Sequence, residues 1–377
     1  MNKVVFWSSV DASAVLGALV KEISDQGVDA EHRSVISVES YRNSKSILGR
    51  VILRFRMYIE YPIRLLLESI LDRGPKIYIV TTNTFFAPLI AIAFSKSNQK
   101  VIHLVWDLYP DVLVGGDVGR LNNPLMALLS KLVGLILSRA AANVFLGERL
   151  LSYAQSRFPV ISNAHIIPVG GDDGLFMESQ FSTIEANKPV DILYCGNLGA
   201  MHDIDTLLGA LDSEIMLQAK FTLSFNASGS NYAALRGELK KKKNYPFVNI
   251  SLEAPLVNAA WRDRMLEAQV ALITLKPNAE KFVMPSKFYS ALVSGQAILA
   301  VCTYDSDLAT LIDENDCGWI IEPGEPDQLR DAILEITTNA GLLSIKRQNA
   351  LKAGREKYSA QVIAEEWVRL FKLIENN

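Results

Sequence analysis

The segment VDILYCGNLGAMHDIDTLLGAL, at residues 190–211, has the pattern of a buried strand, a tight turn and a helix. Residues 191–195 form a short, mostly apolar run, and Leu207 and Leu208 follow as part of an amphipathic helix. Between them, Gly196 and Gly199 allow positive φ angles and a close approach of the backbone to a ligand. Free N–H groups at the following helix start favour an anion. The segment therefore predicts a diphosphate-binding turn, although a tight turn in any α/β domain has the same pattern.

A second segment, MPSKFYSALVSGQAILAV at residues 284–301, joins another helix to another buried strand. Strand-like and helix-like runs also alternate through the rest of the chain. The expected strands are residues 4–7, 77–80, 101–105, 143–146, 191–195, 221–225, 248–250, 270–274, 298–301 and 319–321. This alternation predicts an α/β fold of doubly wound parallel sheets with helices on both faces.

The length of 377 residues, of which 49% are hydrophobic, indicates two domains. The stretch PVGGDDG at residues 168–174 interrupts the alternation and marks the boundary. We therefore expect tandem Rossmann-like domains at residues 1–170 and 171–355, and a last helix within residues 356–377 that packs back on the first domain. Ligands of such sheets bind at the carboxyl ends of the strands, so a cleft between the domains is the expected site.

Charge is unequal between the two halves. Residues 1–168 hold 18 Lys and Arg against 13 Asp and Glu, and residues 169–377 hold 20 against 28, so the whole chain has a net charge of −3. A basic first half suits an anionic acceptor or a lipid surface, although ordinary surface charge explains a surplus this small equally well. No dense basic run of a nucleic-acid-binding type is present, which disfavours nucleic acid as a partner.

The compartment follows from the cysteines and the N-terminus. The three cysteines have no C-x-x-C spacing, and the chain starts directly with an expected strand rather than a signal sequence. We therefore expect a cytoplasmic protein with reduced thiols.

Four segments carry a resemblance to a known family. GNLGAMHD at residues 196–203 and MPSKFYSALVSGQAILA at residues 284–300 resemble the nucleotide-sugar domain of family 4 glycosyltransferases, the retaining GT-B class. VIHLVWDLYPDVLVGG at residues 101–116 and IIPVGGDDGLF at residues 166–176 resemble the bacterial envelope-polysaccharide members. The likeness covers most of the chain. It implies that the C-terminal domain binds a nucleotide sugar and the N-terminal domain an acceptor.

The resemblance also implies which residues bind the donor diphosphate, either through backbone N–H groups of the first turn or through side chains at the second helix start. They are Gly196, Asn197, Leu198, Gly199, Ser286 and Lys287. The Lys287 ammonium would neutralise phosphate charge that grows as the glycosidic bond breaks. A solvated lysine in a first helical turn is the alternative, but a cation there opposes the helix dipole, which favours a bound anion.

The chain departs from the family pattern at several positions. Many members carry two glutamates eight positions apart, where this chain has Phe282 and Ser290. We expect Ser290 to bond a ribose hydroxyl and Glu280 to replace the first carboxylate. His202 stands near the position of a missing basic residue and is expected to donate to a phosphate, with a locally bonded histidine as the alternative. The losses leave donor specificity and the level of activity open.

On the acceptor side, the family's retaining reaction needs no strong protein base, because the departing phosphate takes the acceptor's proton. Protein groups then mainly position the reactants and stabilise charge. We expect Asp107, just after the strand at residues 101–105, to orient the acceptor hydroxyl, with His103 as a second catalytic candidate. A buried core histidine is the alternative for His103.

Two D-x-D triplets, at residues 203–205 and 305–307, have a spacing that some transferases use for manganese. Both lie at apparent helix starts, where aspartate is a favoured cap. We therefore expect no metal and no other cofactor, the nucleotide sugar being a substrate.

Residues 42–64, RNSKSILGRVILRFRMYIEYPIR, hold six basic residues and one acid with apolar residues between them. Such a helix can lie in the headgroup layer of an anionic membrane, with Arg50, Arg54 and Arg56 as its basic anchors. The spacing of Ile52, Phe55 and Ile59 is equally consistent with core packing.

Together these features predict a metal-independent hexosyltransferase that moves a sugar from a UDP- or GDP-linked donor to a lipid-linked glycan acceptor with retention. The expected process is envelope polysaccharide or lipopolysaccharide synthesis at the inner face of the cell membrane. Two alternatives remain open: a sugar-nucleotide epimerase or hydrolase, and a GT-B-like subunit that binds a partner without catalysis. The missing carboxylates favour the second alternative, and the basic helix disfavours the first.

Overall fold

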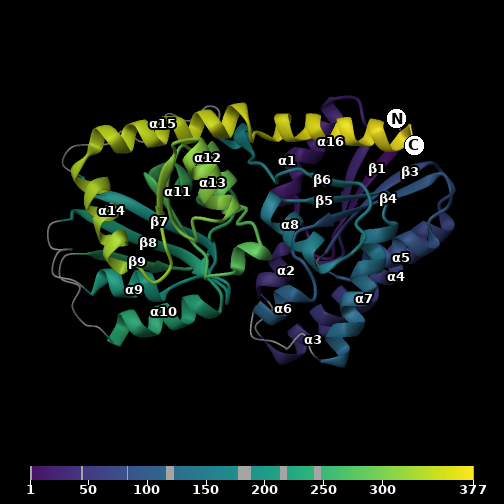
Figure 1. Cartoon of the computed structure of the whole chain (residues 1–377), viewed down its shortest axis with the longest axis horizontal. Coiled ribbons are helices and arrows are strands. Elements are labelled where there is room, and N and C mark those ends of the chain that lie inside the picture. The colour runs from purple at the N-terminus through teal and green to yellow at the C-terminus, as the bar shows by residue number, and fades with distance from the viewer. Residues whose placement is uncertain are drawn as a thin grey trace. The chain divides into compact units, whose positions relative to one another are not determined.

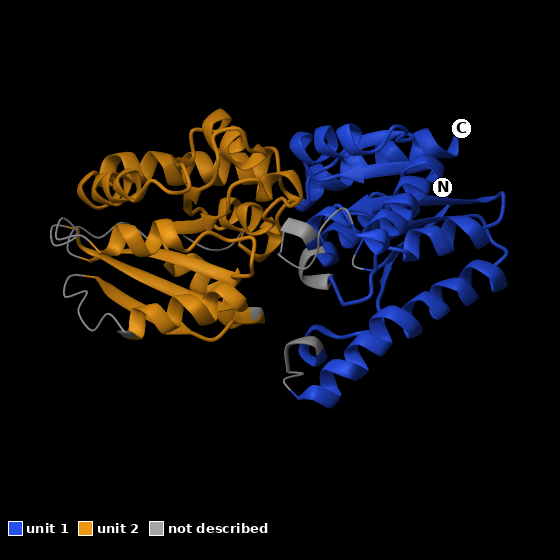
Figure 2. Ribbon diagram, turned by 60° about the horizontal axis from the view of Figure 1, so that its bottom comes forward, with its two compact units in different colours: residues 1–169, 360–377 blue, residues 170–359 orange. Residues whose placement is uncertain are grey.

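The computed structural model describes residues 2–43, 46–82, 84–115, 123–176, 188–212, 219–241 and 248–376. The chain divides into two compact units, residues 1–169 with 360–377 and residues 170–359 (Figure 2). Each unit contains one six-stranded parallel sheet with helices around it (Figure 1). The predicted α/β class with two doubly wound parallel sheets is confirmed.

The sheet of the first unit has the order β2-β1-β3-β4-β5-β6. Its strands are β1 (Lys3–Trp7), β2 (Ala30–Arg33), β3 (Lys76–Thr81), β4 (Gln99–Val105), β5 (Ala142–Phe145) and β6 (Ala164–Ile166). Its helices are α1 (Ser13–Asp25), α2 (Val38–Asn43), α3 (Ile47–Phe55), the π-helical turn η1 (Arg56–Glu60), α4 (Tyr61–Leu71), α5 (Ala87–Phe94), α6 (Asp111–Gly115), α7 (Pro124–Arg139), α8 (Glu148–Arg157) and α16 (Ala360–Glu375). The last helix, α16, lies beside α1 (Figure 1). The Trp367 ring of α16 meets the Phe6 ring of β1 edge to face, with 5.6 Å between the ring centroids.

The sheet of the second unit has the order β12-β11-β10-β7-β8-β9. Its strands are β7 (Val190–Asn197), β8 (Phe221–Ser228), β9 (Asn249–Glu253), β10 (Val270–Thr274), β11 (Ala297–Val301) and β12 (Gly318–Ile321). Its helices are η2 (Asp173–Leu175), α9 (Asp205–Leu211), α10 (Ser230–Lys241), α11 (Asn258–Glu267), η4 (Ala279–Lys281), α12 (Lys287–Val293), α13 (Asp307–Glu314), α14 (Pro326–Thr338) and α15 (Ala340–Glu356).

Every strand expected from the sequence is present, with ends shifted by up to three residues. Two further strands, β2 and β6, were not predicted. Both form sheet edges and are half-buried along their length. Their sequences, AEHR and AHI, lack a continuous apolar run because only the central strands of a parallel sheet are covered on both faces.

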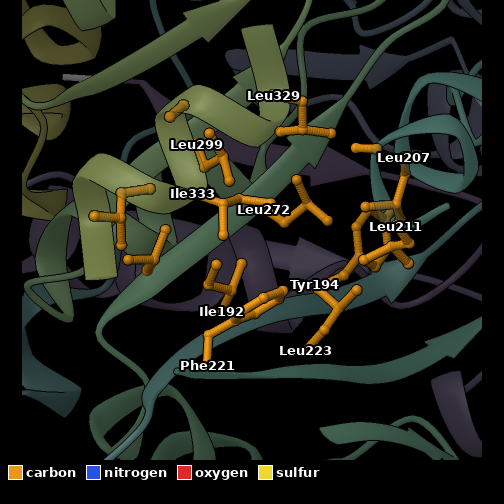
Figure 3. Packing of buried hydrophobic residues seen from close by; sticks show 14 of the residues in the cluster. Ile192, Tyr194, Leu207, Leu211, Phe221, Leu223, Leu272, Leu299, Leu329 and Ile333 are labelled. Atoms are coloured by element: carbon orange, nitrogen blue, oxygen red, sulfur yellow. The ribbon is translucent and has the colours of Figure 1, made fainter. Parts of the chain in front are cut away.

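The core of the second unit fixes the position of β7 in the sheet. Ile192 and Tyr194 of β7 pack on one face of the sheet against Leu207 and Leu211 of α9, together with residues of α14 (Figure 3). Leu193, between them in sequence, belongs to a separate cluster with Met265 and Val293 of α11 and α12 on the opposite face. Burial on both faces fixes the register of β7 and therefore the position of the turn that follows it.

Within the described ranges, no helix combines the length and the apolar character needed to cross a bilayer. Cys302 and Cys317 are buried and pack as small apolar residues, whereas Cys195 is half-buried.

Candidate donor site and its counterpart in the first unit

The turn after β7 is the predicted diphosphate-binding turn. Gly196 has a φ angle of 128°, which only glycine adopts readily, and Gly196 and Asn197 still pair with Ala227 and Ser228 of β8. The Leu198 N–H donates to the Ser228 carbonyl at 2.6 Å, and the Leu198 side chain is 1% exposed. Leu198 therefore anchors the turn and has no N–H to offer a phosphate, which corrects the expectation for this residue.

The N–H groups that remain available lie further along the turn. In the part of the chain that the structure describes, the N–H groups of Gly199, Ala200 and Met201 meet no protein acceptor at hydrogen-bonding distance. The His202 N–H closes the turn onto the Gly199 carbonyl at 3.1 Å. Of the four glycine-loop residues that were predicted, Gly199 keeps an N–H without an acceptor in the described residues, and such N–H groups continue from it to Met201, an arrangement suited to an anion.

The turn is braced by the segment that follows β8. Gly229 has a φ angle of 117°, and a Cβ atom there would lie 2.5 Å from the Leu198 carbonyl oxygen and 2.6 Å from Asn197 Oδ1. The backbone N–H of Asn231 donates to the Leu198 carbonyl at 3.0 Å, and its side chain donates to the His202 carbonyl at 2.6 Å. Sequence reasoning missed both residues. The Ser-Gly-Ser-Asn run directly after an apolar strand was the available signal.

Lys287 is the first residue of α12 and lies over the turn. Its stem passes Gly196, where an added Cβ atom would lie 3.9 Å from Lys287 Cε. The ammonium hydrogen-bonds the Tyr194 hydroxyl, lies 4.0 Å from the centre of the Tyr194 ring, and reaches the Asn197 carbonyl at 3.5 Å. Burial lowers the pKa of Lys287 to about 7, because no carboxylate in the described residues pairs with it.

His202 does not play the role expected of it. Its Nδ1 hydrogen-bonds the Thr274 carbonyl, and since a carbonyl only accepts, the proton is on Nδ1. Burial, aided by the nearby Lys287 ammonium, lowers the pKa of His202 to about 3 and keeps the ring neutral. Nε2 then carries a lone pair rather than a proton. His202 therefore holds the turn to the end of β10 through a residue distant in sequence, rather than through a local bond, and its Nε2 has no proton to donate to a phosphate.

Glu280 lies in η4, in the loop between β10 and α12. Its Oε2 is buried without a hydrogen-bond partner in the described residues, and burial raises the pKa of this carboxyl. The carboxylate also acts on the buried thiol of Cys302, just after β11, whose pKa it helps to raise. Glu280 thus lies by the carboxyl ends of the central strands with an unused acceptor.

The remaining donor candidates occupy α12. Ser286 is exposed at the helix start, and Ser290, one turn later, is half-buried. Phe282, at the other lost glutamate position, is also half-buried. The structure brings the turn, Lys287 and His202 together. Within the described ranges, no hydrogen bond joins the side chain of Glu280, Ser286 or Ser290 to the turn.

In the first unit, Asp107 follows β4 at the carboxyl edge of the sheet. The N–H groups of Trp106 and Asp107 both donate to Thr82 Oγ1 at 3.2 Å, which ties this segment to the end of β3. The Asp107 carboxylate makes no hydrogen bond within the described ranges, and burial raises its pKa to about 6. A half-buried carboxylate with no hydrogen-bond partner in the described part of the chain is suited to accept from a substrate hydroxyl.

His103 is a core residue rather than a catalytic one. It lies within β4, paired with Val80 of β3 and Asn143 of β5, and is 1% exposed. Its Nδ1 bonds Asn143 Oδ1 at 3.1 Å, and burial lowers its pKa to about 4. The catalytic expectation for His103 is therefore wrong, because substrate cannot reach a side chain inside the sheet.

The basic segment of the first unit has an exposed apolar face. Ile52, Phe55 and Ile59 are 49%, 59% and 46% exposed, so core packing does not explain them. Arg50 and Arg54 are also exposed. Arg56 instead donates to Glu60 at 2.9 Å and to the Val35 carbonyl, so it faces the body of the unit and is not available as a membrane anchor.

Both D-x-D triplets lie at helix starts. Asp203 Oδ1 accepts the Thr206 N–H at 3.0 Å, and Ser306, inside the second triplet, accepts the Ala309 N–H at 3.1 Å. Across the ranges that the structure describes, no three His, Cys, Asp or Glu side chains gather where they can hold a metal ion.

The fold places the protein among structures of the GT-B class. The crystal structure of HepE from Anabaena in complex with UDP matches with a TM-score of 0.67 over 98% of this chain and 99% of that chain, at 10% identity. The crystal structure of WaaG, a glycosyltransferase involved in lipopolysaccharide biosynthesis, matches with a TM-score of 0.64 over 97% and 99%, at 12% identity. At these identities the comparisons show the fold alone.

In sequence, the chain is 25% identical to the probable glycosyltransferase WbjE of Pseudomonas aeruginosa over 256 residues. The match covers 63% of this chain and 60% of the length of that protein. No family model matches the chain.

Proposed function

We propose that the protein is a glycosyltransferase that uses a nucleoside diphosphate sugar as donor. The observation that carries this proposal is the Lys287 ammonium, unpaired with any carboxylate in the described residues, beside the free N–H groups of Gly199, Ala200 and Met201. A cation and several amides around one turn match the charge and the acceptor oxygens of a diphosphate. The likeness to WbjE and WaaG supports envelope polysaccharide or lipopolysaccharide synthesis as the process.

In this mechanism the donor turn stabilises the leaving group. As the bond between the sugar and the diphosphate breaks, negative charge grows on the phosphate oxygens, and Lys287 and the turn amides stabilise it. The acceptor oxygen bonds the anomeric carbon on the face that the phosphate leaves, and a phosphate oxygen takes the proton of the acceptor hydroxyl. Transfer thus proceeds with retention and without a metal ion. Asp107 orients the acceptor by accepting a hydrogen bond from its hydroxyl.

Glu280 and Ser290 complete the donor site in this proposal. Glu280 Oε2, which is buried without a hydrogen-bond partner among the described residues, accepts a bond from a hydroxyl of the ribose or the donor sugar, and Ser290 bonds a second hydroxyl. UDP is the first donor nucleotide to test, because HepE was crystallised with it, and GDP is the second.

The test is a thermal-shift panel of UDP, GDP and TDP and their sugars with the full chain, followed by product analysis with lipid-linked glycan acceptors. A ligand that binds only the folded state at 100 times its Kd stabilises it by about 2.7 kcal/mol, which is a readily measured shift. Stabilisation by one nucleotide and acceptor-dependent release of its diphosphate support the proposal. Absence of any nucleotide-dependent shift rejects it in favour of a non-catalytic subunit. Conversion of the sugar nucleotide without acceptor rejects it in favour of an epimerase or hydrolase.

We further propose that the lipid-linked acceptor is reached from the membrane surface through α3, η1 and α4. Exposed apolar residues recur along one side of these helices at three- and four-residue spacing: Leu48, Ile52, Phe55, Ile59, Ile63, Leu67 and Leu71. Arg50 and Arg54 lie exposed on the same helix as the first of these residues. Apolar side chains flanked by cations suit the headgroup layer of an anionic membrane at its inner face.

Reversal of the two charges in the variant Arg50→Glu/Arg54→Glu tests this surface. Each basic residue near an anionic membrane contributes about 1 kcal/mol, so the variant should bind phosphatidylglycerol vesicles at least about tenfold more weakly in co-sedimentation. Lys352→Glu/Arg355→Glu, on the exposed side of α15, is the matched control and should sediment like the wild type. Equal binding of all three proteins would exclude this surface.

A further inference from the structure

Tyr194 of β7 is buried beneath the donor turn, and its hydroxyl lies between two groups of the candidate site. The side chain is 0% exposed, and its hydroxyl hydrogen-bonds both the Asn197 carbonyl, at 2.9 Å, and the Lys287 ammonium. A carbonyl and an ammonium impose the roles: the hydroxyl donates to Asn197 and accepts from Lys287. Tyr194 therefore links the strand end to the cation.

The Tyr194 ring has little freedom to leave this position. It stacks on Phe225 of β8 with 6.0 Å between centroids and a 28° angle, and it meets His202 edge-on at 5.8 Å. The Lys287 ammonium lies 4.0 Å from the ring centre, a distance typical of a cation–π contact. A rigid ring with one polar tip thus fixes where the flexible lysine side chain ends.

The surroundings of Lys287 are otherwise poor in compensating charge. The titratable groups that face it are Tyr194 and Cys195 on β7 and the neutral His202 on the turn. No carboxylate within the described residues forms an ion pair with it. A half-buried cation without an ion-pair partner favours an anion, which in this proposal arrives with the substrate.

We propose that Tyr194 is a positioning residue of the donor site. Its hydroxyl holds the Lys287 ammonium over the Gly196 turn, where a diphosphate oxygen can accept a hydrogen bond from the ammonium. This inference rests on the proposed use of the turn as a diphosphate site. It separates two roles for Tyr194, because an aromatic residue that served packing alone would need its ring and not its hydroxyl.

The experiment compares Tyr194→Phe, Lys287→Ala and the double variant, with UDP and inorganic pyrophosphate as titrants in calorimetry. Loss of a hydrogen bond to a charged group should weaken the binding of both by about tenfold in Tyr194→Phe. In the Lys287→Ala background the same change should have no further effect, because Tyr194 acts through the lysine. Tyr232→Phe, whose hydroxyl bonds the Glu253 carbonyl on the surface of the same unit, is the matched control and should bind like the wild type.

Unchanged affinity in Tyr194→Phe overturns the proposal, and so does a tenfold loss that persists without Lys287. A second measurement needs no nucleotide: the titration of the Lys287 side chain followed by heteronuclear NMR. The wild-type midpoint is expected near pH 7 and should fall in Tyr194→Phe, since the accepting hydroxyl stabilises the charged form. An unchanged midpoint overturns the positioning role. Failure of the wild type to bind either titrant would reject the proposed function, while the midpoint would still decide the role of Tyr194.

Discussion

The carboxyl edges of the two sheets have the same architecture and opposite chemistry. In the second unit the edge presents a cation, Lys287, beside free N–H groups of the turn after β7. In the first unit the corresponding edge presents a carboxylate, Asp107, which no hydrogen bond compensates within the described residues. Both side chains are half-buried, and burial lowers the pKa of Lys287 and raises the pKa of Asp107.

This difference shows that a parallel sheet determines where a site forms, while a few side chains determine which ligand it suits. One edge is suited to the anionic part of a donor and the other to a hydroxyl. Similar residues away from the edges serve the fold instead. Asp111, four residues after Asp107, is 1% exposed and accepts from Arg157 at 2.7 Å and from Tyr153 at 2.8 Å.

The largest effect is expected from substitution of Gly229, because this residue braces the turn beside Lys287. In Gly229→Ala, a methyl group 2.5 Å from the Leu198 carbonyl oxygen, at a positive φ angle, should cost about 2–5 kcal/mol of folding free energy. Urea unfolding and UDP calorimetry measure the two consequences. Gly237→Ala, on α10 with open space around the new Cβ atom, is the control and should stabilise by about 0.5–1 kcal/mol. Equal stability of the two variants would contradict the bracing role of Gly229.

Removal of the cation should leave the fold intact and weaken the donor site. Lys287→Ala loses a charge-assisted contact to phosphate worth about 1.5–3 kcal/mol, so Kd for UDP should rise roughly 10–100-fold in calorimetry. Lys346→Ala removes an equal charge from the same unit, where the lysine bonds Asp316 at 2.5 Å, and should leave Kd unchanged. An unaltered Kd in Lys287→Ala would remove this residue from the site.

The smallest effect is expected at Asp107. The sign of its contribution to the free energy of unfolding follows from its raised pKa. The pKa of Asp107 is raised from 3.8 to about 6 in the folded protein, so the folded state binds the proton more tightly than the unfolded chain. The free energy of unfolding should therefore fall as pH rises from about 4 to about 6, and the loss persists above that range. Asp107→Asn removes this penalty and should be more stable than the wild type by about 1–2 kcal/mol near pH 8.

The same variant should transfer sugar to the acceptor up to about tenfold more slowly, since an amide orients a hydroxyl less well than a carboxylate does. Urea unfolding at about pH 4 and about pH 8, with an acceptor-dependent rate assay, measures both effects. A variant with wild-type activity, or one destabilised near pH 8, would show that the Asp107 carboxylate is not held for substrate.

The sequence predicted the fold well because parallel strands buried on two faces need continuous apolar runs, such as VALIT in β10 and AILAV in β11. It missed β2 and β6, because these two edge strands are only half-buried and their sequences lack such a run. It also predicted a glycine turn after β7 and a lysine at the start of α12, because Gly196 and Lys287 have local signatures. The partners of these residues come from other strands and have no such signature. The sequence pattern indicates only a core residue at Tyr194 and an ordinary turn glycine at Gly229.

Sequence by itself determined that two doubly wound sheets form, and that a glycine turn and a lysine lie at the edge of the second, because periodicity and glycine conformation are local properties. Tertiary structure alone decided which groups remain free to act. The Leu198 N–H is used by β8, the His202 proton by Thr274 and the Arg56 guanidinium by Glu60, whereas the Lys287 side chain has no carboxylate partner in the described residues. Hydrogen-bond and charge compensation depend on neighbours brought together by folding, and residue order does not reveal them.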